Sequence, residues 1–262
     1  MALSPDSTVP LNSGTRIPLL GFGVWQLAPG AGTRKSVLEA LKVGYRHIDT
    51  AKIYGNEADV GEAIRESGLK RDEVFVTTKV WNGDQGYAST LAACDESLAK
   101  LGTGYIDLYL IHWPVAGKGP DTWRAFEKLK ADNKVRAIGV SNYLERELDE
   151  MPSYTRTVPA ADQVEFNPFH YLKGVEDRCK KLGTVLEAYS PLSRGQALGD
   201  PKLKAIAAKV GRTPAQVLLR WGLQHGAVIL PRSSKPAHIR ENAQLFDFEL
   251  PSAVMAALDG LG

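Results

Sequence analysis

Short hydrophobic runs alternate with longer amphipathic stretches along almost the whole chain. Eight runs have the composition of buried β-strands and lie at residues 19–23, 45–49, 74–79, 105–112, 135–141, 161–166, 184–190 and 227–233. Between them, apolar residues recur at helical spacing, most clearly at 36–44, 57–68, 90–102, 122–132 and 215–226. Several of these stretches end at Gly, which readily takes the left-handed conformation that ends a helix. Eight alternating strand and helix units predict a closed α/β barrel.

The segment before these units predicts a β-hairpin over Val9 to Ile17 that turns at Asn12-Ser13-Gly14. We therefore expect one domain over residues 1–262, a (β/α)8 TIM barrel with an amino-terminal β-hairpin and a short carboxyl-terminal tail. The alternative is an open doubly wound sheet, which commonly binds dinucleotides through G-x-G-x-x-G after its first strand. In Gly21-Phe22-Gly23-Val24-Trp25-Gln26, Gln26 stands where the third glycine belongs. A nucleotide would have to be bound in another way.

Composition favours a protein that acts on small molecules. The chain has 262 residues, 44% of them hydrophobic, and its formal charge of +2 is spread without long runs of like charge. This distribution does not resemble a surface for nucleic acid or membranes. Cys94 and Cys179 form neither a disulfide framework nor a zinc motif, and no metal is expected. With no signal-peptide pattern at the amino terminus, we expect a cytoplasmic protein that acts as a monomer.

Asp49, Tyr54, Lys79 and His112 stand at or just past the ends of predicted strands. Each has an ordinary alternative explanation, such as a helix cap, a loop aromatic, a solvated strand end or a core histidine. In parallel α/β proteins, however, the carboxyl ends of the strands meet on one face, so these side chains can converge. A carboxylate, a phenol, an ammonium and an imidazole brought together predict proton-transfer chemistry.

The expected roles follow from the acidities of the four groups. An ammonium about 4 Å from a phenolate stabilises it by roughly 4 kcal/mol at an effective dielectric of about 20, so Lys79 should lower the pKa of Tyr54. We expect Asp49 to hold Lys79 charged, and neutral His112 to position a carbonyl oxygen. Tyr54 would then be the general acid for a developing alkoxide. Since no side chain can supply hydride, a nicotinamide cofactor is implied.

Later strand ends offer groups suited to such a cofactor. Ser141, Asn142 and Gln163 could form hydrogen bonds with an amide, and Tyr189 offers a flat face. Residues 190–195 could follow a pyrophosphate, and 231–235 bring cations and hydroxyls to a helix expected near Pro236. These cations favour a 2′-phosphate and therefore NADP over NAD, although turn chemistry and a solvated basic face remain the alternatives.

The motifs GFGVWQ, HIDTAKIYGNEADVG, VTTKVW, LYLIHWP, GVSNY, DQVEFNP, EAYSPLSRG and ILPRSS…IRENAQLFDFEL resemble the landmarks of the aldo-keto reductases, in order, from about Thr8 to Leu258. The resemblance implies a (β/α)8 barrel, NADPH-dependent carbonyl reduction, and Asp49, Tyr54, Lys79 and His112 at the catalytic tetrad positions. It also implies cofactor contacts from Val24, Trp25, Asp49, Ser141, Asn142, Gln163, Tyr189, Ser190, Leu192, Ser193, Arg232, Ser233, Ser234, His238, Arg240, Glu241 and Asn242. Phe22, Trp25, Trp81 and Trp113, with Tyr54 and His112, would line a substrate pocket for apolar or aromatic carbonyls, with barrel-rim packing as the alternative for the aromatic residues.

The sequence departs from the family pattern at a few places. His238 stands where many relatives carry an arginine for the 2′-phosphate, which leaves NADH as an alternative cofactor unless Lys235 or Arg240 compensates. Asn167 and Asp162 replace a common histidine and asparagine, and neither is expected to carry chemistry. The brief tail and the brief segment 114–120 predict an open pocket with loose substrate selection, as in the bacterial 2,5-diketo-D-gluconate reductase-like branch. An alcohol dehydrogenase acting oxidatively and a non-catalytic nucleotide-binding barrel are the competing functions.

Overall fold

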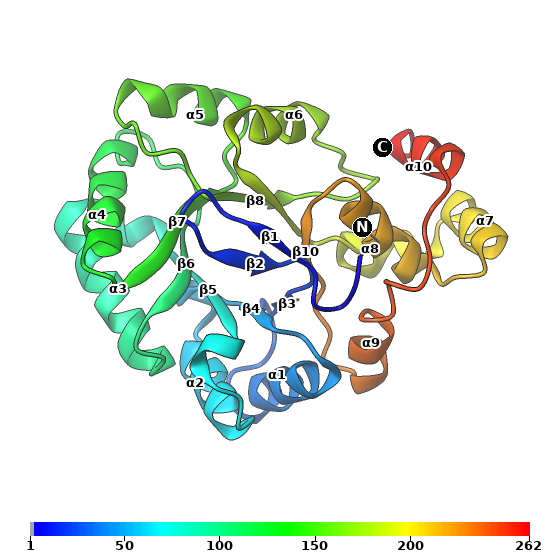
Figure 1. Ribbon diagram of the computed structural model, residues 1–262, viewed down its shortest axis with the longest axis horizontal. Helices are drawn as coiled ribbons and strands as arrows, with labels where there is room; N and C mark the ends of the chain where they lie inside the picture. The colour runs from blue at the N-terminus through cyan, green and yellow to red at the C-terminus, as the bar shows by residue number, and fades with distance from the viewer. Residues whose placement is uncertain (1–2) are drawn as a thin grey trace.

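The computed structural model describes residues 3–262, which form a barrel of eight parallel strands surrounded by helices (Figure 1). In sheet order the strands are β10 (Val228–Leu230), β9 (Val185–Tyr189), β8 (Ala161–Glu165), β7 (Val135–Ser141), β6 (Ile106–Ile111), β5 (Phe75–Val80), β4 (His47–Asp49) and β3 (Phe22–Gly23). The barrel closes where Gly21 N donates to Ile229 O over 2.9 Å and Gly23 N donates to Pro231 O over 3.1 Å. The eight strands lie in the runs predicted from the sequence, and the barrel prediction is confirmed.

The helices cover the outside of the barrel, with their apolar faces on the strands (Figure 1). Each of the five predicted helical stretches overlaps a helix, because its apolar residues face the barrel and most of its charged residues face solvent. The helices are α1 (Ala31–Val43), α2 (Glu57–Glu66), α3 (Tyr87–Leu101), α4 (Gly119–Ala131), α5 (Glu145–Glu150), α6 (Lys173–Leu182), α7 (Pro201–Val210), α8 (Pro214–Gln224), α9 (Pro236–Glu241) and α10 (Ser252–Asp259).

The predicted hairpin forms and lies across the amino-terminal end of the barrel (Figure 1). Strands β1 (Thr8–Pro10) and β2 (Arg16–Pro18) pair antiparallel, with Val9 opposite Ile17. The turn needs Gly14, whose φ of 89° lies in the left-handed region. Because Ile17 is fully buried, the hairpin acts as a plug for the apolar interior at this end and leaves the carboxyl ends of the strands free for a site.

The barrel interior is apolar over most of its volume but carries a group of buried polar side chains. Five of these side chains are each at most 4% exposed and lie on β4, β5, β8 and β9: His47, Asp49, Lys79, Gln163 and Glu187. Ionisable groups are almost never fully buried unless they are paired or hydrogen-bonded. Their gathering inside the barrel therefore points to a site rather than to packing.

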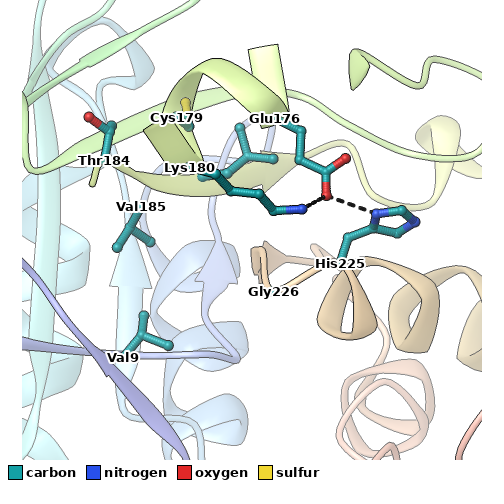
Figure 2. Close-up of a pocket in the computed structure, with 9 residues that line it drawn as sticks. Val9, Glu176, Cys179, Lys180, Thr184, Val185, His225 and Gly226 are labelled. Atoms are coloured by element: carbon teal, nitrogen blue, oxygen red, sulfur yellow. Dashed lines mark hydrogen bonds and ion pairs between the residues drawn. The ribbon is translucent and has the colours of Figure 1, made fainter. Parts of the chain in front are cut away.

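A separate group of charges ties the carboxyl-terminal helix to the barrel; we call it the His225 clamp. His225, just after α8, contacts Glu176 of α6 through Nδ1 and Asp259 of α10 through Nε2, both at 3.0 Å. Trp221 also donates to Asp259 over 2.7 Å. Figure 2 shows Glu176 between His225 and Lys180, beside a cavity of about 140 Å³. Two carboxylates on one imidazole favour its doubly protonated form.

The His225 clamp should make stability depend on pH. Burial lowers the pKa of His225, but the contacts with Glu176 and Asp259 outweigh it and raise this pKa above 6.5. The clamp therefore stabilises the fold fully below about pH 6.5, and this contribution is lost as the pH rises through the raised pKa. Thermal melting of the wild type and of His225→Gln, followed by circular dichroism, should give a difference in Tm that is largest in mild acid. A difference that does not change with pH would contradict the protonated clamp.

Candidate active site

Asp49 and Lys79 form a buried ion pair at the carboxyl ends of β4 and β5. Lys79 Nζ donates to Asp49 Oδ1 and Oδ2, both at 2.8 Å, and to the carbonyl oxygen of Thr50 at 2.9 Å. Both side chains are almost fully buried, so the three acceptors replace the water that the ammonium has lost. Burial lowers the pKa of Lys79, yet Asp49 outweighs burial and raises it. The ammonium is therefore charged and fixed in direction.

Tyr54 ends a 3₁₀ turn, residues 52–54, that follows β4 and brings its ring to this pair. The Lys79 ammonium lies 5.2 Å from the centre of the Tyr54 ring. The His112 ring, just after β6, meets Tyr54 edge to face at 5.6 Å, and Trp81 meets His112 at 5.2 Å. The structure thus brings together all four side chains that the sequence singles out, with Trp81 beside them.

The expectation of an acidic Tyr54 is wrong in sign. Burial raises the pKa of Tyr54 more than the Lys79 ammonium lowers it, and Asp49 raises it further, so the net pKa is above the usual value of 10.0. The pattern of charges along the sequence contains no measure of burial, and burial decides the sign of the shift here. Tyr54 therefore carries its proton at neutral pH, and the Lys79 ammonium keeps the pKa of Tyr54 lower than burial alone would make it.

His112 is neutral, as the sequence argument requires. Burial, and after it the Lys79 ammonium, lowers the pKa of His112 to about 3. The carbonyl oxygen of His112 accepts a hydrogen bond of 2.8 Å from Asn142 Nδ2, which ties the end of β6 to β7. A neutral imidazole beside a phenol can donate a hydrogen bond to a carbonyl oxygen without adding charge to the site.

The residues expected around a carboxamide form one network beside the ion pair. Gln163 Nε2 donates to Asp49 Oδ2 over 2.9 Å, and Ser141 Oγ donates to the Gln163 carbonyl over 2.7 Å. Tyr189 OH donates to Asn142 Oδ1 over 2.8 Å. Asn142 has a left-handed φ of 62°, a conformation that asparagine tolerates better than most residues. The network fixes a half-buried Tyr189 ring at the carboxyl end of β9 and links it through Asn142 to the end of β7.

The loop after β9 has an unusual backbone, because Ser190, Ser193 and Arg194 all have φ between 46° and 53°. Buried Asn167 holds it: Asn167 Nδ2 donates to the Ser190 carbonyl over 3.1 Å, and Ser193 Oγ donates to Asn167 Oδ1 over 2.8 Å. Leu192 is half-buried within this loop. Sequence reasoning gave Asn167 no part in the site, and here it fixes the segment expected to follow a pyrophosphate. The sequence signal that could have pointed to this role is the position of Asn167 in the E-x-N-P stretch just after a predicted strand.

The segment from β10 into α9 presents its cations to solvent. Arg232 Nη2 donates to Gln26 Oε1 over 3.2 Å, and Ser233 Oγ accepts from Lys235 N over 3.1 Å. Arg240, which with Lys235 was a candidate to compensate for His238, forms an ion pair with Glu39 of α1. The remaining expected residues of this segment differ in exposure: Ser234 and His238 are exposed, Glu241 is half-buried and Asn242 is buried.

The aromatic residues expected to line a substrate pocket differ in exposure, and some lie at the rim of the barrel while Phe22 lies in the core. Trp25 and Trp113 are 40% and 43% exposed, and the Arg194 guanidinium lies 5.4 Å from the Trp25 ring. Phe22 is buried against Tyr45 and does not line the pocket. It alternates with Gly21, where a Cβ would lie 2.6 Å from His47 Nδ1 inside the barrel, so Phe22 points outward. Val24, also expected near a cofactor, has a buried side chain and donates its N–H to the Asp49 carbonyl over 3.0 Å.

Two cavities lie away from this site. The one in Figure 2 is lined by Val9 of the hairpin and by Thr184 and Gly226, which precede the amino ends of β9 and β10. A second, of about 370 Å³, lies beside the hairpin and β5. Neither touches the tetrad, which lies past the opposite ends of the strands. Among residues 3–262, no helix is long and apolar enough to cross a membrane.

Comparisons with known proteins agree with the barrel fold. The family model described as "Aldo/keto reductase family" matches residues 19–262. The chain is 50% identical to a glyoxal reductase of Bacillus subtilis, over 100% of this chain and 95% of that protein. Its fold matches a crystal structure of an aldo/keto reductase from Brucella melitensis with a TM-score of 0.93 and 47% identity, covering 98% of this chain and 99% of that one.

A further solved structure carries a nucleotide. It is an aldo-keto reductase from Bombyx mori in complex with NADP, with a TM-score of 0.90 and 34% identity, covering 97% of this chain and 92% of that one. The family match over nearly the whole chain and the confirmed barrel lead to one conclusion: the chain belongs to the aldo/keto reductase family.

Proposed function

We propose that the chain reduces aldehydes and ketones to alcohols, with hydride from a nicotinamide cofactor and a proton from Tyr54. The observation that carries the proposal is the buried Asp49–Lys79 pair, whose ammonium faces the Tyr54 ring at 5.2 Å. This arrangement keeps a protonated phenol next to a fixed positive charge. Such a pair suits a group that must give up its proton as negative charge develops on a nearby oxygen.

Each residue of the site has one task in this reaction. Neutral His112 orients the substrate carbonyl by a hydrogen bond, and Tyr54 transfers its phenolic proton to the same oxygen as the carbonyl carbon is reduced. Lys79 stabilises the phenolate that forms, and Asp49 keeps Lys79 charged and aimed. When bound, a reduced nicotinamide supplies the hydride, which none of these side chains can provide. Exposed rings of Trp25 and Trp113 at the mouth favour carbonyls with an apolar or aromatic substituent.

The test is consumption of reduced cofactor in the presence of a panel of carbonyls. The panel should include a small dicarbonyl, since a relative is a glyoxal reductase, and aromatic aldehydes, which the exposed tryptophans favour. We expect near-ultraviolet absorbance of the reduced cofactor to fall, with one alcohol formed per cofactor consumed. A constant absorbance despite measurable cofactor binding would instead favour a non-catalytic, nucleotide-binding barrel.

We also infer that the cofactor is NADPH and that NADH can replace it. Exposed Arg232, Ser234 and Lys235 fit phosphate oxygens by charge and hydrogen bonding, which supports a 2′-phosphate. Because Arg240 is paired with Glu39 and a histidine stands at position 238 in place of an arginine, this preference should be small. Fluorescence titration with each cofactor should give dissociation constants within about tenfold of each other, or 1.4 kcal/mol. A ratio of a thousand or more would contradict this inference.

A further inference from the structure

Glu187 is an ionisable group in the barrel interior for which the proposed reaction has no task. It lies on β9, is fully buried, and is the register partner of Gln163 on β8. Gln163 Nε2, which donates to Asp49 over 2.9 Å, also lies 3.5 Å from Glu187 Oε2. One amide group therefore connects Glu187 to the carboxylate that holds the Lys79 ammonium.

The surroundings of Glu187 offer little to stabilise a negative charge. Its Oε1 has no hydrogen-bond partner within residues 3–262, and His47 Nε2 lies 3.9 Å from it. His47 is neutral, because burial and then Lys79 lower its pKa to about 3. Asp49 is a like charge, and Lys79 is already fully engaged by three oxygens. On the opposite face of β8, Asp162 is another buried acid.

We propose that Glu187 is a positioning residue of the reductase site, neutral in the active enzyme, and that its ionisation suppresses proton donation by Tyr54. This inference rests on the proposed function. Glu187 touches neither the substrate nor the reacting atoms, and it acts through Gln163 and Lys79. A neutral carboxyl leaves the ammonium balanced by Asp49 alone, so that its remaining field acts on Tyr54.

Ionisation would change this balance. A second carboxylate near Lys79 offsets the ammonium, so the phenolate of Tyr54 is less stabilised and Tyr54 becomes a weaker acid. The electrostatic environment agrees in sign: burial, followed by Asp49, raises the pKa of Glu187 to about 8, and the charge of Glu187 raises the pKa of Lys79. Tyr54 itself ionises at higher pH, so the two titrations are separable.

The first experiment is the pH dependence of carbonyl reduction at saturating cofactor. We expect kcat/KM of the wild type to fall about threefold to tenfold above pH 8, because each pKa unit of Tyr54 corresponds to up to tenfold in rate. In Glu187→Gln, which keeps the shape without the charge, the ratio of the high-pH value to the neutral value should return to near one. Asp162→Asn is the matched control, since it removes another buried acid on the neighbouring strand, and it should keep the fall. The same fall in Glu187→Gln would overturn the proposal.

The second experiment needs no turnover and also serves if Glu187→Gln is poorly folded. Infrared difference spectra of the wild type with bound cofactor should show the C=O band of a buried protonated carboxyl that disappears with a midpoint near pH 8. This band should be retained in Asp162→Asn and missing in Glu187→Gln where that variant folds. A Glu187 that is ionised at neutral pH, seen as no titrating band, would overturn the inference. If the wild type shows the band but reduces no carbonyl, the proposed function is contradicted, whereas the protonated state of Glu187 is supported.

Discussion

Tyr54→Phe is expected to lower kcat for carbonyl reduction by about 10² to 10⁴-fold, the usual contribution of a positioned proton donor. The substitution removes one hydroxyl and keeps the ring that packs edge to face on His112. Cofactor affinity should therefore stay within about threefold, because the hydroxyl acts mainly in the transition state. Single-turnover kinetics would measure the chemical step, and fluorescence titration would measure binding.

A second phenol provides the control for this substitution. Tyr171 donates to Glu176 over 2.9 Å in the His225 clamp, away from the tetrad. Tyr171→Phe should lower stability and leave kcat unchanged within about twofold, since it removes a hydrogen bond to a charged group of roughly 1.5 to 3 kcal/mol and no catalytic group. Equal turnover of Tyr54→Phe and the wild type would remove Tyr54 from its assigned role.

Where each tetrad residue stands could be predicted from the sequence because the carboxyl ends of parallel strands share one face. Asp49 and Lys79 end predicted strands, His112 follows the next one, and all three converge as expected. The same rule explains why Gln163, from a strand more than a hundred residues away, lies on the same face, although its hydrogen bond with Asp49 was not predicted. Periodicity and topology were sufficient at these positions.

The failures concern quantities that depend on packing in three dimensions. The acidity of Tyr54 is decided by burial, which competes with the charge of Lys79, and a one-dimensional pattern does not weigh one against the other. The ion pair of Arg240 with Glu39 joins α9 to α1, which touch only because the barrel closes. The direction of Phe22 belongs here too, because alternation puts it opposite Gly21 and Gly23, and only the packing of Gly21 against His47 shows that the glycines face inward.

Lys79→Met should affect both stability and turnover. It leaves Asp49 as a buried carboxylate without its cation, which typically costs about 3 to 5 kcal/mol. The ammonium at 5.2 Å stabilises a phenolate by about 3 kcal/mol at an effective dielectric of about 20. If about half of this is felt in the transition state, kcat should fall roughly tenfold or more. Chemical denaturation and steady-state kinetics would measure the two effects.

The double variant Asp49→Asn/Lys79→Met separates them. It removes both charges and keeps an oxygen that can accept from Gln163 Nε2 in place of Asp49 Oδ2. Much of the stability lost in Lys79→Met should return, since no buried charge is left unpaired, whereas kcat should stay low because the phenolate still lacks its ammonium. Recovery of kcat together with stability would mean that Lys79 only supports the fold, and the electrostatic role of the ion pair in proton donation would have to be abandoned.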